Sequence, residues 1–384
     1  MNFFHQTSDL DKNMNTSHDN LLKDEQNRVV DIACVDLFCG AGGLTHGLNR
    51  QGIRVGYGVD IDPNCRFPYE ENNNATFIET NVENIMPEDL SNFFGDAKLR
   101  LLAGCAPCQP FSVYSQKGRK QRNDHKWELV SVFGKLISAN NPEFVTMENV
   151  PQLLHHEVFQ EFLNSLTGYN VSYAIVDCAE YGIPQSRKRL VLLASRLGPI
   201  SLVPPPIFDH TPRTTVRQAI AHFRPLAAGE ADPEDALHAA ASLSELNLRR
   251  IRASKPGGTW RDWDDELITK CHRKDTGKTY PSVYGRMIWD APSPTITTQC
   301  FGYGNGRFGH PEQDRAISLR EAAVLQTFPD AYRFVAPNEH VCFGKIGRLI
   351  GNAVPVRIGE VIAQTFLQHA AEVLCADAAP PLPA

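Results

Sequence analysis

Short apolar runs rich in β-branched residues alternate with helix-like stretches from residue 29 to residue 166, and this pattern restricts the fold more than any other feature of the chain. The runs are VVDIACVDLF, RVGYGVDI, TFIETNV, LRLLAGC and EFVTMENV, separated by stretches such as LTHGLNRQ and PEDLSNFFG. Strands that are apolar along their whole length belong in a parallel sheet covered by helices on both faces. The sequence therefore predicts an α/β fold with a doubly wound, mostly parallel sheet.

The 384 residues allow two or three domains. Residues 1–28 are polar and lack periodicity, which predicts a mobile tail. We expect a first domain over 29–200, completed by 342–374, and a smaller irregular domain over 201–341 that begins at the proline-rich linker LGPISLVPPPIFDHTPRTT. Residues 375–384 are expected to be disordered. Further strands are predicted at NVSYAIVDCAEYG and RLVLLAS, and helices at 318–327 and 357–374.

Composition and targeting signals exclude several classes of protein. No run approaches the roughly 20 apolar residues of a membrane span, and the first 22 residues lack the pattern of a signal peptide, so we expect a soluble, cytoplasmic protein. The ten cysteines show no framework spacing and are expected to be reduced. The net charge of −6 argues against nucleic-acid binding over the whole surface but leaves a local cleft open. Each of the basic stretches at 117–126 and 249–286, taken alone, is best explained as a solvated face.

Glycines and carboxylates follow the first two strands. Residues 36–43 read DLFCGAGG at a strand-to-helix turn, where glycines let the backbone approach a ligand closely. The spacing is not G-x-G-x-x-G, and such a turn can also be purely structural. Asp60 follows the second strand about 20 residues later, which is where a carboxylate binds a ribose hydroxyl in dinucleotide-binding folds. Together the two features favour a nucleoside-type cofactor.

A Cys-x-x-Cys segment, GCAPCQPFS at 104–112, follows the fourth strand. Zinc is disfavoured because only Cys271 and His272 offer a completion, so no metal site is predicted. A thioredoxin-like site is disfavoured because the flanking chain does not match that small fold. The remaining interpretation is a nucleophilic thiolate at the carboxyl edge of the sheet, facing the cofactor.

Three further segments carry candidate groups. Glu148 ends the fifth strand, where partial burial would raise its pKa for proton transfer, although it could instead cap the next helix. In QSRKR at 185–189, alternation places Arg187 and Arg189 on one face, unless these are solvated edge-strand charges. The segment GKIGRLIGNAVP at 344–355 is a loop-to-helix junction or simply a helix start.

These five segments, in this order, resemble the cytosine-5 DNA methyltransferase family of the bacterial restriction-modification type, over most of residues 31–365. DLFCGAGG resembles its cofactor loop, PCQPFS its nucleophile motif, ENV its proton-donor motif and QSRKR its arginine motif. RMIWDAPSPTITT and GNAVPV resemble its closing motifs. Each motif alone is weak evidence for the resemblance, but the series of motifs in this order is highly specific.

The resemblance implies a methyl donor, S-adenosylmethionine, and a set of site residues. It implies Cys108 as nucleophile, Glu148 at ring nitrogen 3 and Arg187 as support for a flipped base. The implied catalytic set is Cys108, Gln109, Glu148, Arg187 and Arg189. The implied cofactor-binding set is Asp36, Phe38, Gly40, Gly42, Gly43, Asp60, Ile61, Asn81, Pro107, Asn352 and Val354. Two positions depart from the family pattern, since Asn81 stands where an acidic residue is frequent and Lys126 where an arginine is usual.

The chemistry independently demands residues of these types. Carbon 5 of cytosine is a weak nucleophile, and thiolate addition at carbon 6 converts the ring into an enamine that can accept a methyl group at carbon 5. Protonation of ring nitrogen 3 stabilises the charge that addition creates, which requires an acid kept protonated by burial. The base must leave the duplex, at a cost of a few kcal/mol. We expect loop 109–126 to close over it.

The region that reads DNA sequence in this family corresponds to about 200–285, and its compact length favours one recognition element. The predicted DNA-binding set is Ser112, Arg119, Lys120, Gln185, Trp260, Arg261, Trp263, Arg273, Lys274 and Lys278. The tryptophans could instead be core residues, and lysines mostly contact phosphate. The expected partners are double-stranded DNA and a restriction endonuclease acting on the same site without a stable complex; the enzyme is expected to be a monomer that binds no membrane.

Two rival functions stay open on the sequence alone. The first is an RNA (tRNA) cytosine-5 methyltransferase built on the same motifs. The basic and aromatic region before residue 286 disfavours this function. A protein that recognises a sequence in duplex DNA needs a surface that fits a groove, and this region could supply one. The second is an inactive DNA-binding regulator, disfavoured because every expected catalytic residue is present. Amino-group methyltransferases are disfavoured because their (D/N/S)PPY segment is absent from the sequence.

Overall fold

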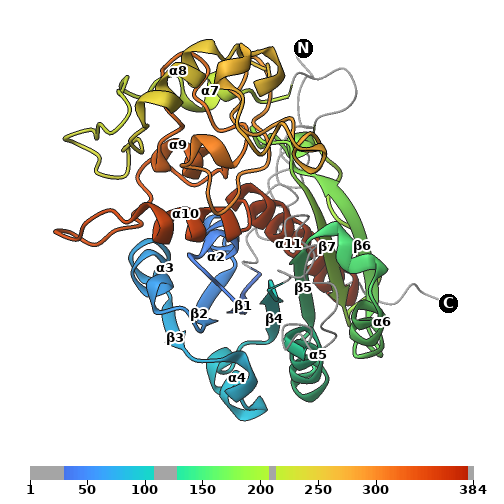
Figure 1. The fold of residues 1–384 in the computed structure, drawn as a ribbon. Helices are drawn as coiled ribbons and strands as arrows, with labels where there is room; N and C mark the ends of the chain where they lie inside the picture. The colour runs from blue at the N-terminus through green and yellow to red at the C-terminus, as the bar shows by residue number, and fades with distance from the viewer. Residues whose placement is uncertain (1–29, 108–127, 207–212, 379–384) are drawn as a thin grey trace, which may run out of the picture. The chain divides into compact units, whose positions relative to one another are not determined.

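Seven strands form one sheet in the computed structural model, which describes residues 30–107, 128–206 and 213–378 (Figure 1). The order across the sheet is β3-β2-β1-β4-β5-β7-β6. The strands are β1 (Ile32–Leu37), β2 (Arg54–Asp60), β3 (Thr76–Glu79), β4 (Leu99–Gly104), β5 (Phe144–Asn149), β6 (Asn170–Asp177) and β7 (Lys188–Ser195). The neighbours from β3 to β5 are parallel, whereas β7 is antiparallel to both β5 and β6. The predicted mostly parallel α/β sheet is confirmed.

Helices cover both faces of the sheet, which is why its central strands are apolar throughout. The helices are α2 (Gly43–Arg50), α3 (Arg66–Asn73), α4 (Pro87–Phe94), α5 (Glu128–Asn140), α6 (Glu157–Asn164), α7 (Val216–Ile220), α8 (Glu245–Ala253), α9 (Leu319–Leu325), α10 (Phe343–Asn352) and α11 (Val356–Ala378). All six residues of β5 are buried. Phe144 packs on Phe366 of α11, with ring centroids 5.1 Å apart, whereas Val145 belongs to the core that includes residues of α5 and α6. Because successive strand side chains point to opposite faces, the two residues contact different helix layers.

The predicted helices at 318–327 and 357–374 are present as α9 and α11, while the sequence reasoning did not predict α5 or α8. The expected disordered end at 375–384 is wrong for its first residues, because α11 continues to Ala378. No proline lies between Val356, where α11 begins, and Pro380, so no proline in this stretch forces the helix to stop earlier. Within the described ranges, no helix combines the length and apolar character needed to cross a membrane.

Residues 213–341 are irregular, as predicted, and contain α7, α8, α9 and short 3₁₀ turns. A small aromatic core that includes Trp260, Trp263 and Tyr303 lies within this region. A second core joins residues of α9 to Tyr69 and Phe77 of the first region. Part of the predicted second domain therefore packs directly on the elements around β2 and β3, and its boundary at 200/201 stays a prediction.

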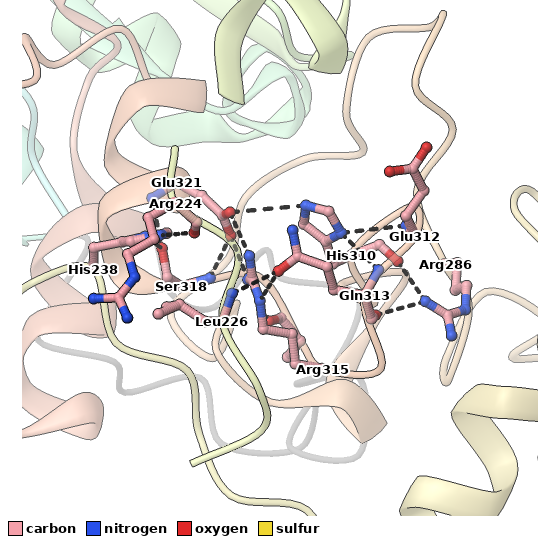
Figure 2. Close-up of polar contacts among 11 residues, drawn as sticks. Arg224, Leu226, His238, Arg286, His310, Glu312, Gln313, Arg315, Ser318 and Glu321 are labelled. Carbon is pink, nitrogen blue, oxygen red and sulfur yellow. Dashed lines mark hydrogen bonds and ion pairs between the residues drawn. The ribbon is translucent and has the colours of Figure 1, made fainter. Parts of the chain in front are cut away.

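A buried network of charged and polar side chains fixes the start of α9 (Figure 2). The Arg315 guanidinium binds both carboxylate oxygens of Glu321 at 2.7 and 2.8 Å, and Glu321 also accepts a hydrogen bond from the amide of Ser318. His310 lies at the edge of this network, and burial lowers its pKa to about 4. Arg286, a member of the predicted basic stretch, is likewise buried and donates to backbone carbonyls that include those of His310 and Gln313. These buried charged side chains therefore hold segments of the irregular region together through hydrogen bonds and an ion pair.

Candidate functional site

The predicted chemical groups converge on one edge of the sheet. The glycine-rich loop follows β1, Asp60 ends β2, residues 105–107 follow β4, and Glu148 and Asn149 end β5. The carboxyl ends of parallel strands share an edge, and the antiparallel β7 begins at the same edge with Arg189 as its second residue. The site therefore draws on strands from both sides of β4.

The glycine-rich loop has an unusual backbone. Phe38, Gly40 and Gly42 have positive φ angles of 60°, 53° and 87°. A Cβ atom on Gly42 would lie 2.5 Å from Nδ2 of Asn73, so no other residue fits there without displacement. The amide of Gly40 donates to Oδ2 of Asp60 at 3.0 Å. Asp60 therefore shapes the loop, and burial raises the pKa of its carboxyl group.

Asp36 is the most deeply buried carboxylate of the loop, with 1% of its surface exposed. Its Oδ2 accepts a hydrogen bond from the Thr45 hydroxyl at 2.7 Å, whereas its Oδ1 is buried without a hydrogen-bond partner among the described residues. Burial raises the pKa of Asp36 to about 7. A buried carboxylate oxygen without a partner is suited to a positively charged ligand group.

The structure brings some of the other predicted cofactor residues together. Ile61 is 67% exposed beside Asp60 and offers an apolar surface. A Cβ atom on Gly43 would lie 2.3 Å from the Val354 carbonyl oxygen, so the start of α2 packs tightly against the segment after α10. Asn352 is exposed at the end of α10. Pro107 is half-buried beside the first residue outside the described part.

Asn81 has local partners instead. Its Oδ1 accepts a hydrogen bond from the amide of Glu83, and its Nδ2 donates to the Glu83 carboxylate. These contacts cap a short turn after β3. The predicted adenine contact of Asn81 stays a prediction.

Glu148 lies in a buried position, 7% exposed, beside an arginine. The Nε of Arg189 lies 2.8 Å from Oε1 of Glu148. In the β5–β7 ladder Glu148 is opposite Val191, so Arg189 is its diagonal neighbour on the same face. Burial raises the pKa of Glu148, and the positive charges of Arg189 and Arg187 offset part of that effect. The alternative capping role is wrong, because the turn after β5 begins at Val150 and has no side-chain cap.

Arg187 and Gln185 are both buried, and the predicted support of a flipped base by Arg187 stays a prediction. Arg187 donates to the carbonyls of Ile296 at 2.9 Å and Gly351 at 3.3 Å. Gln185 has no exposed surface, and its side-chain Nε2 donates a hydrogen bond to Oε1 of Gln326 at 2.8 Å. The predicted DNA contact of Gln185 is therefore wrong. Arg189 forms an ion pair with Glu148, whereas Arg187 donates to backbone carbonyls of both closing motifs while its charge still acts on Glu148.

The nucleophile segment is described only up to residue 107. Cys108, Gln109, Ser112, Arg119, Lys120 and Lys126 lie outside the described residues. Just before them, the side chain of Asn149 donates to the Ala106 carbonyl at 3.1 Å. The sequence reasoning did not single out Asn149, although its place directly after Glu148 at a strand end was the available signal. Asn149 thus ties the end of β5 to the start of the nucleophile segment.

The predicted DNA-reading residues fall into two groups. Arg261, Arg273, Lys274 and Lys278 are exposed. Trp260 and Trp263 are each 5% exposed and pack in the aromatic core, so the predicted DNA contacts of both tryptophans are wrong. Their indole N–H groups donate to the Tyr280 carbonyl and the Ser254 hydroxyl, which makes their burial tolerable.

Comparisons with known proteins agree with this geometry. The family model described as C-5 cytosine-specific DNA methylase matches residues 32–368. The chain is 51% identical over 341 residues to the type II methylase M.HgiDII of Herpetosiphon aurantiacus, covering 87% of this chain and 94% of the relative. It is 30% identical to the type II methyltransferase M1.HphI of Haemophilus parahaemolyticus, covering 88% and 87%. A methyltransferase structure from Entamoeba histolytica shares the fold with a TM-score of 0.57 at 16% identity, covering 88% of this chain and 98% of that structure.

Proposed function

The chain belongs to the C-5 cytosine-specific DNA methylase family, and from this premise we propose how its own residues carry out the reaction. It is a DNA cytosine-5 methyltransferase of the restriction-modification type. The observation that best supports a specific mechanism is the buried pair of Glu148 and Arg189 at the sheet edge that also carries the glycine-rich loop.

Use of S-adenosylmethionine follows in general from membership of a methyltransferase family. Three features in and beside the loop fit this cofactor. The buried Oδ1 of Asp36 suits a cationic group, a Cβ atom on Gly40 would meet no described atom within 4 Å, and Ile61 exposes an apolar surface next to Asp60. When bound, S-adenosylmethionine supplies the methyl group. The residues proposed to hold it are Asp36, Phe38, Gly40, Gly42, Gly43, Asp60, Ile61, Asn81, Pro107, Asn352 and Val354.

Glu148 is proposed to donate a proton to ring nitrogen 3 of the target cytosine. Burial raises the pKa of this carboxyl group, which favours the protonated form. Arg189 stabilises the carboxylate left after proton transfer, because its guanidinium is already in contact with Oε1. The buried surroundings of Glu148 thus favour its protonated form, and the Arg189 guanidinium favours its carboxylate form.

The thiolate of Cys108 is proposed to add to carbon 6 of the cytosine. This addition forms the S–C6 bond and moves electron density to the ring, which the proton from Glu148 neutralises at nitrogen 3. Once carbon 5 carries the methyl group, its proton passes to a base from solvent and the S–C6 bond breaks, which releases the Cys108 thiolate. Nitrogen 3 returns its proton to Glu148, and the aromatic ring is restored. Because the attack comes from above the ring plane, the base must be flipped out of the duplex. Asn149 supports this arrangement by fixing the Ala106 carbonyl, two residues before Cys108 in the sequence.

Duplex DNA is the substrate implied by the family. We propose that the exposed residues Arg261, Arg273, Lys274 and Lys278 contact it. We further propose that the enzyme acts as a monomer in the cytoplasm, where its substrate lies, and that a restriction endonuclease recognises the same site without forming a stable complex.

A methyl-transfer assay with two substrates and two cysteine variants tests this proposal. We expect labelled methyl groups to be transferred to duplex DNA and not to transfer RNA. Cys108→Ser should abolish turnover and covalent trapping on 5-fluorocytosine DNA while DNA binding persists, because the thiolate makes few ground-state contacts. Cys105→Ser, the matched control three residues away, should remain active. Trapping by the Cys108 variant, or methylation of transfer RNA alone, would contradict the proposal.

A further inference from the structure

The glycine-rich loop is held by a residue that lies nearly 300 positions further along the chain. The hydroxyl of Tyr332 donates to the carbonyl oxygen of Ala41 at 2.5 Å, across a sequence separation of 291 residues. Tyr332 follows α9 and is 1% exposed. Ala41 stands between Gly40 and Gly42, both of which have positive φ angles. The contact therefore falls at the centre of the turn.

This turn needs external support, because glycines have the widest choice of backbone conformations. Its bonds come from separate elements: Asp60 of β2 accepts from the Gly40 amide, and Tyr332 donates to the Ala41 carbonyl. On its other side the Tyr332 hydroxyl accepts a hydrogen bond from Nδ2 of Asn73 at 3.2 Å. A Cβ atom on Gly42 would lie 3.1 Å from the same hydroxyl, so the backbone approaches Tyr332 closely at two successive residues.

Tyr332 itself is fixed at both ends. Its ring packs among Phe328 and Phe334, with centroids 4.6 and 5.1 Å away. Its backbone carbonyl accepts a hydrogen bond from Arg320 at 2.8 Å, and the same guanidinium pairs with Asp235. The hydroxyl thus projects from a rigid support to the loop.

We propose that Tyr332 is a positioning residue for cofactor binding, which holds the Ala41 carbonyl so that the loop keeps the shape that receives S-adenosylmethionine. This inference rests on the proposed function, because it takes the loop to be the cofactor site. Glu148 lies on β5 and Arg189 on β7, whereas the glycine-rich loop follows β1, and neither residue makes a hydrogen bond to Tyr332 among the described contacts. Loss of the hydroxyl should therefore affect cofactor affinity more than the chemical step.

Tyr332→Phe in the full-length enzyme tests the proposal, because it removes the hydroxyl and keeps the ring. We expect the Kd for S-adenosylhomocysteine and the KM for S-adenosylmethionine to rise roughly three- to tenfold, the range of one net hydrogen bond. We expect kcat at saturating cofactor to stay near that of the wild type. A merely structural role would lower the melting temperature without producing this split.

Tyr303→Phe is the matched control, since Tyr303 is equally buried and its hydroxyl contacts Ser254 at 2.7 Å in the separate aromatic core. It should leave the Kd for S-adenosylhomocysteine unchanged. Unchanged affinity in the Tyr332 variant, an equal loss in the Tyr303 variant, or a fall in kcat alone would overturn the inference while leaving the proposed function intact. If the wild-type enzyme bound neither compound, the proposed cofactor site itself would fail, and this inference with it.

Discussion

Arg189 holds its Nε 2.8 Å from Oε1 of Glu148, and both side chains are largely removed from solvent. Two opposing effects act on the glutamate at this position. Loss of hydration favours the neutral acid, whereas the adjacent guanidinium favours the carboxylate, and burial is the larger effect on its pKa. A proton can therefore leave Glu148 without leaving an uncompensated charge behind.

Glu148→Gln should lower turnover by roughly 10²–10⁴-fold, the usual contribution of a general acid, while DNA and cofactor affinities change little. Since its pKa is raised, Glu148 is protonated below that pKa, and the wild-type methylation rate should fall as pH rises through it. The glutamine variant should lack this dependence. Single-turnover rates across the pH range measure it. Glu143→Gln, which weakens a partly buried ion pair with Arg100 just before the start of β5, is the control and should keep full activity. An active Glu148 variant would contradict the assignment.

Asp36→Asn should alter the pH dependence of both stability and cofactor affinity. The pKa of Asp36 is about 7 in the folded protein and 3.8 for the unperturbed group, so the folded state retains the proton more strongly. The stabilising effect is complete below pH 3.8 and is lost as pH rises through 7. A cationic ligand prefers the ionised carboxylate, so wild-type affinity for S-adenosylmethionine should rise across pH 7.

Calorimetric titrations and melting curves at several pH values compare the two proteins. The asparagine variant should bind the cofactor more weakly above pH 7 and show a flatter profile. Because it carries no ionised group at this position, it should also gain stability relative to the wild type as pH increases. Parallel profiles for the two proteins would show that Asp36 does not titrate in this range.

The two arginines of QSRKR should respond differently to lysine substitution. Arg187→Lys leaves carbonyls of Ile296 and Gly351 without their fork-shaped partner, so we expect a loss of roughly 1–3 kcal/mol in the free energy of unfolding. Arg189→Lys should mainly lower turnover. Urea unfolding and steady-state rates separate the effects. The opposite pattern would return Arg187 to the position beside the base.

Residues of the irregular region should likewise separate into core and surface. Trp260→Ala should cost roughly 3–5 kcal/mol of stability, as expected for truncating a buried aromatic side chain. Lys274→Ala, at an exposed position, should leave the melting temperature unchanged. If Lys274 contacts a phosphate, its loss should weaken DNA binding and reduce the salt slope by about one. Equal salt slopes in the variant and the wild type would remove Lys274 from the proposed contact set.

Exchange of residues 200–285 for the equivalent segment of a relative tests where specificity resides. We expect the methylated sequence to move with the segment while the Kd for S-adenosylmethionine stays the same, because the glycine-rich loop lies outside it and the exchange keeps Asp235, which pairs with Arg320 behind Tyr332. Bisulfite sequencing of genomic DNA from expressing cells identifies the site before and after the exchange. A chimera that kept its original preference would place recognition elsewhere, with the stretch 301–309 as the first candidate.

The fold was predictable where the sequence pattern has a single physical meaning. Apolar runs separated by helical stretches require a sheet covered on both faces, and glycines after β1 require a tight turn. The direction of β7 was not determined, because the run RLVLLAS is equally apolar in either orientation. Helix α5 was missed because LVSVF within it has the apolar and β-branched character of a strand.

The candidate site was predictable by residue type but not by side-chain direction. Alternation placed Arg187 and Arg189 on one face, yet only the position of the closing motifs decides that Arg187 meets carbonyls and Arg189 meets Glu148. Tryptophans near basic residues fit both a DNA surface and a core, and packing decides for the core. Tyr332 could not be linked to Ala41 from sequence, because 291 residues separate them.

The position of Arg189 beside Glu148 depends on the register in which β7 pairs with β5. Because neighbouring residues of a strand face opposite sides, moving β7 by one residue relative to β5 would exchange Arg189 for Lys188 or Leu190 at the position diagonal to Glu148. A lysine presents one compact charge, and a leucine none. An odd-numbered insertion or deletion between Asp177 and Lys188 that shifted the strand would thus remove the Arg189 partner of Glu148 without changing Glu148 itself. A shift of two residues would keep the face but bring Arg187 or Val191 to that position.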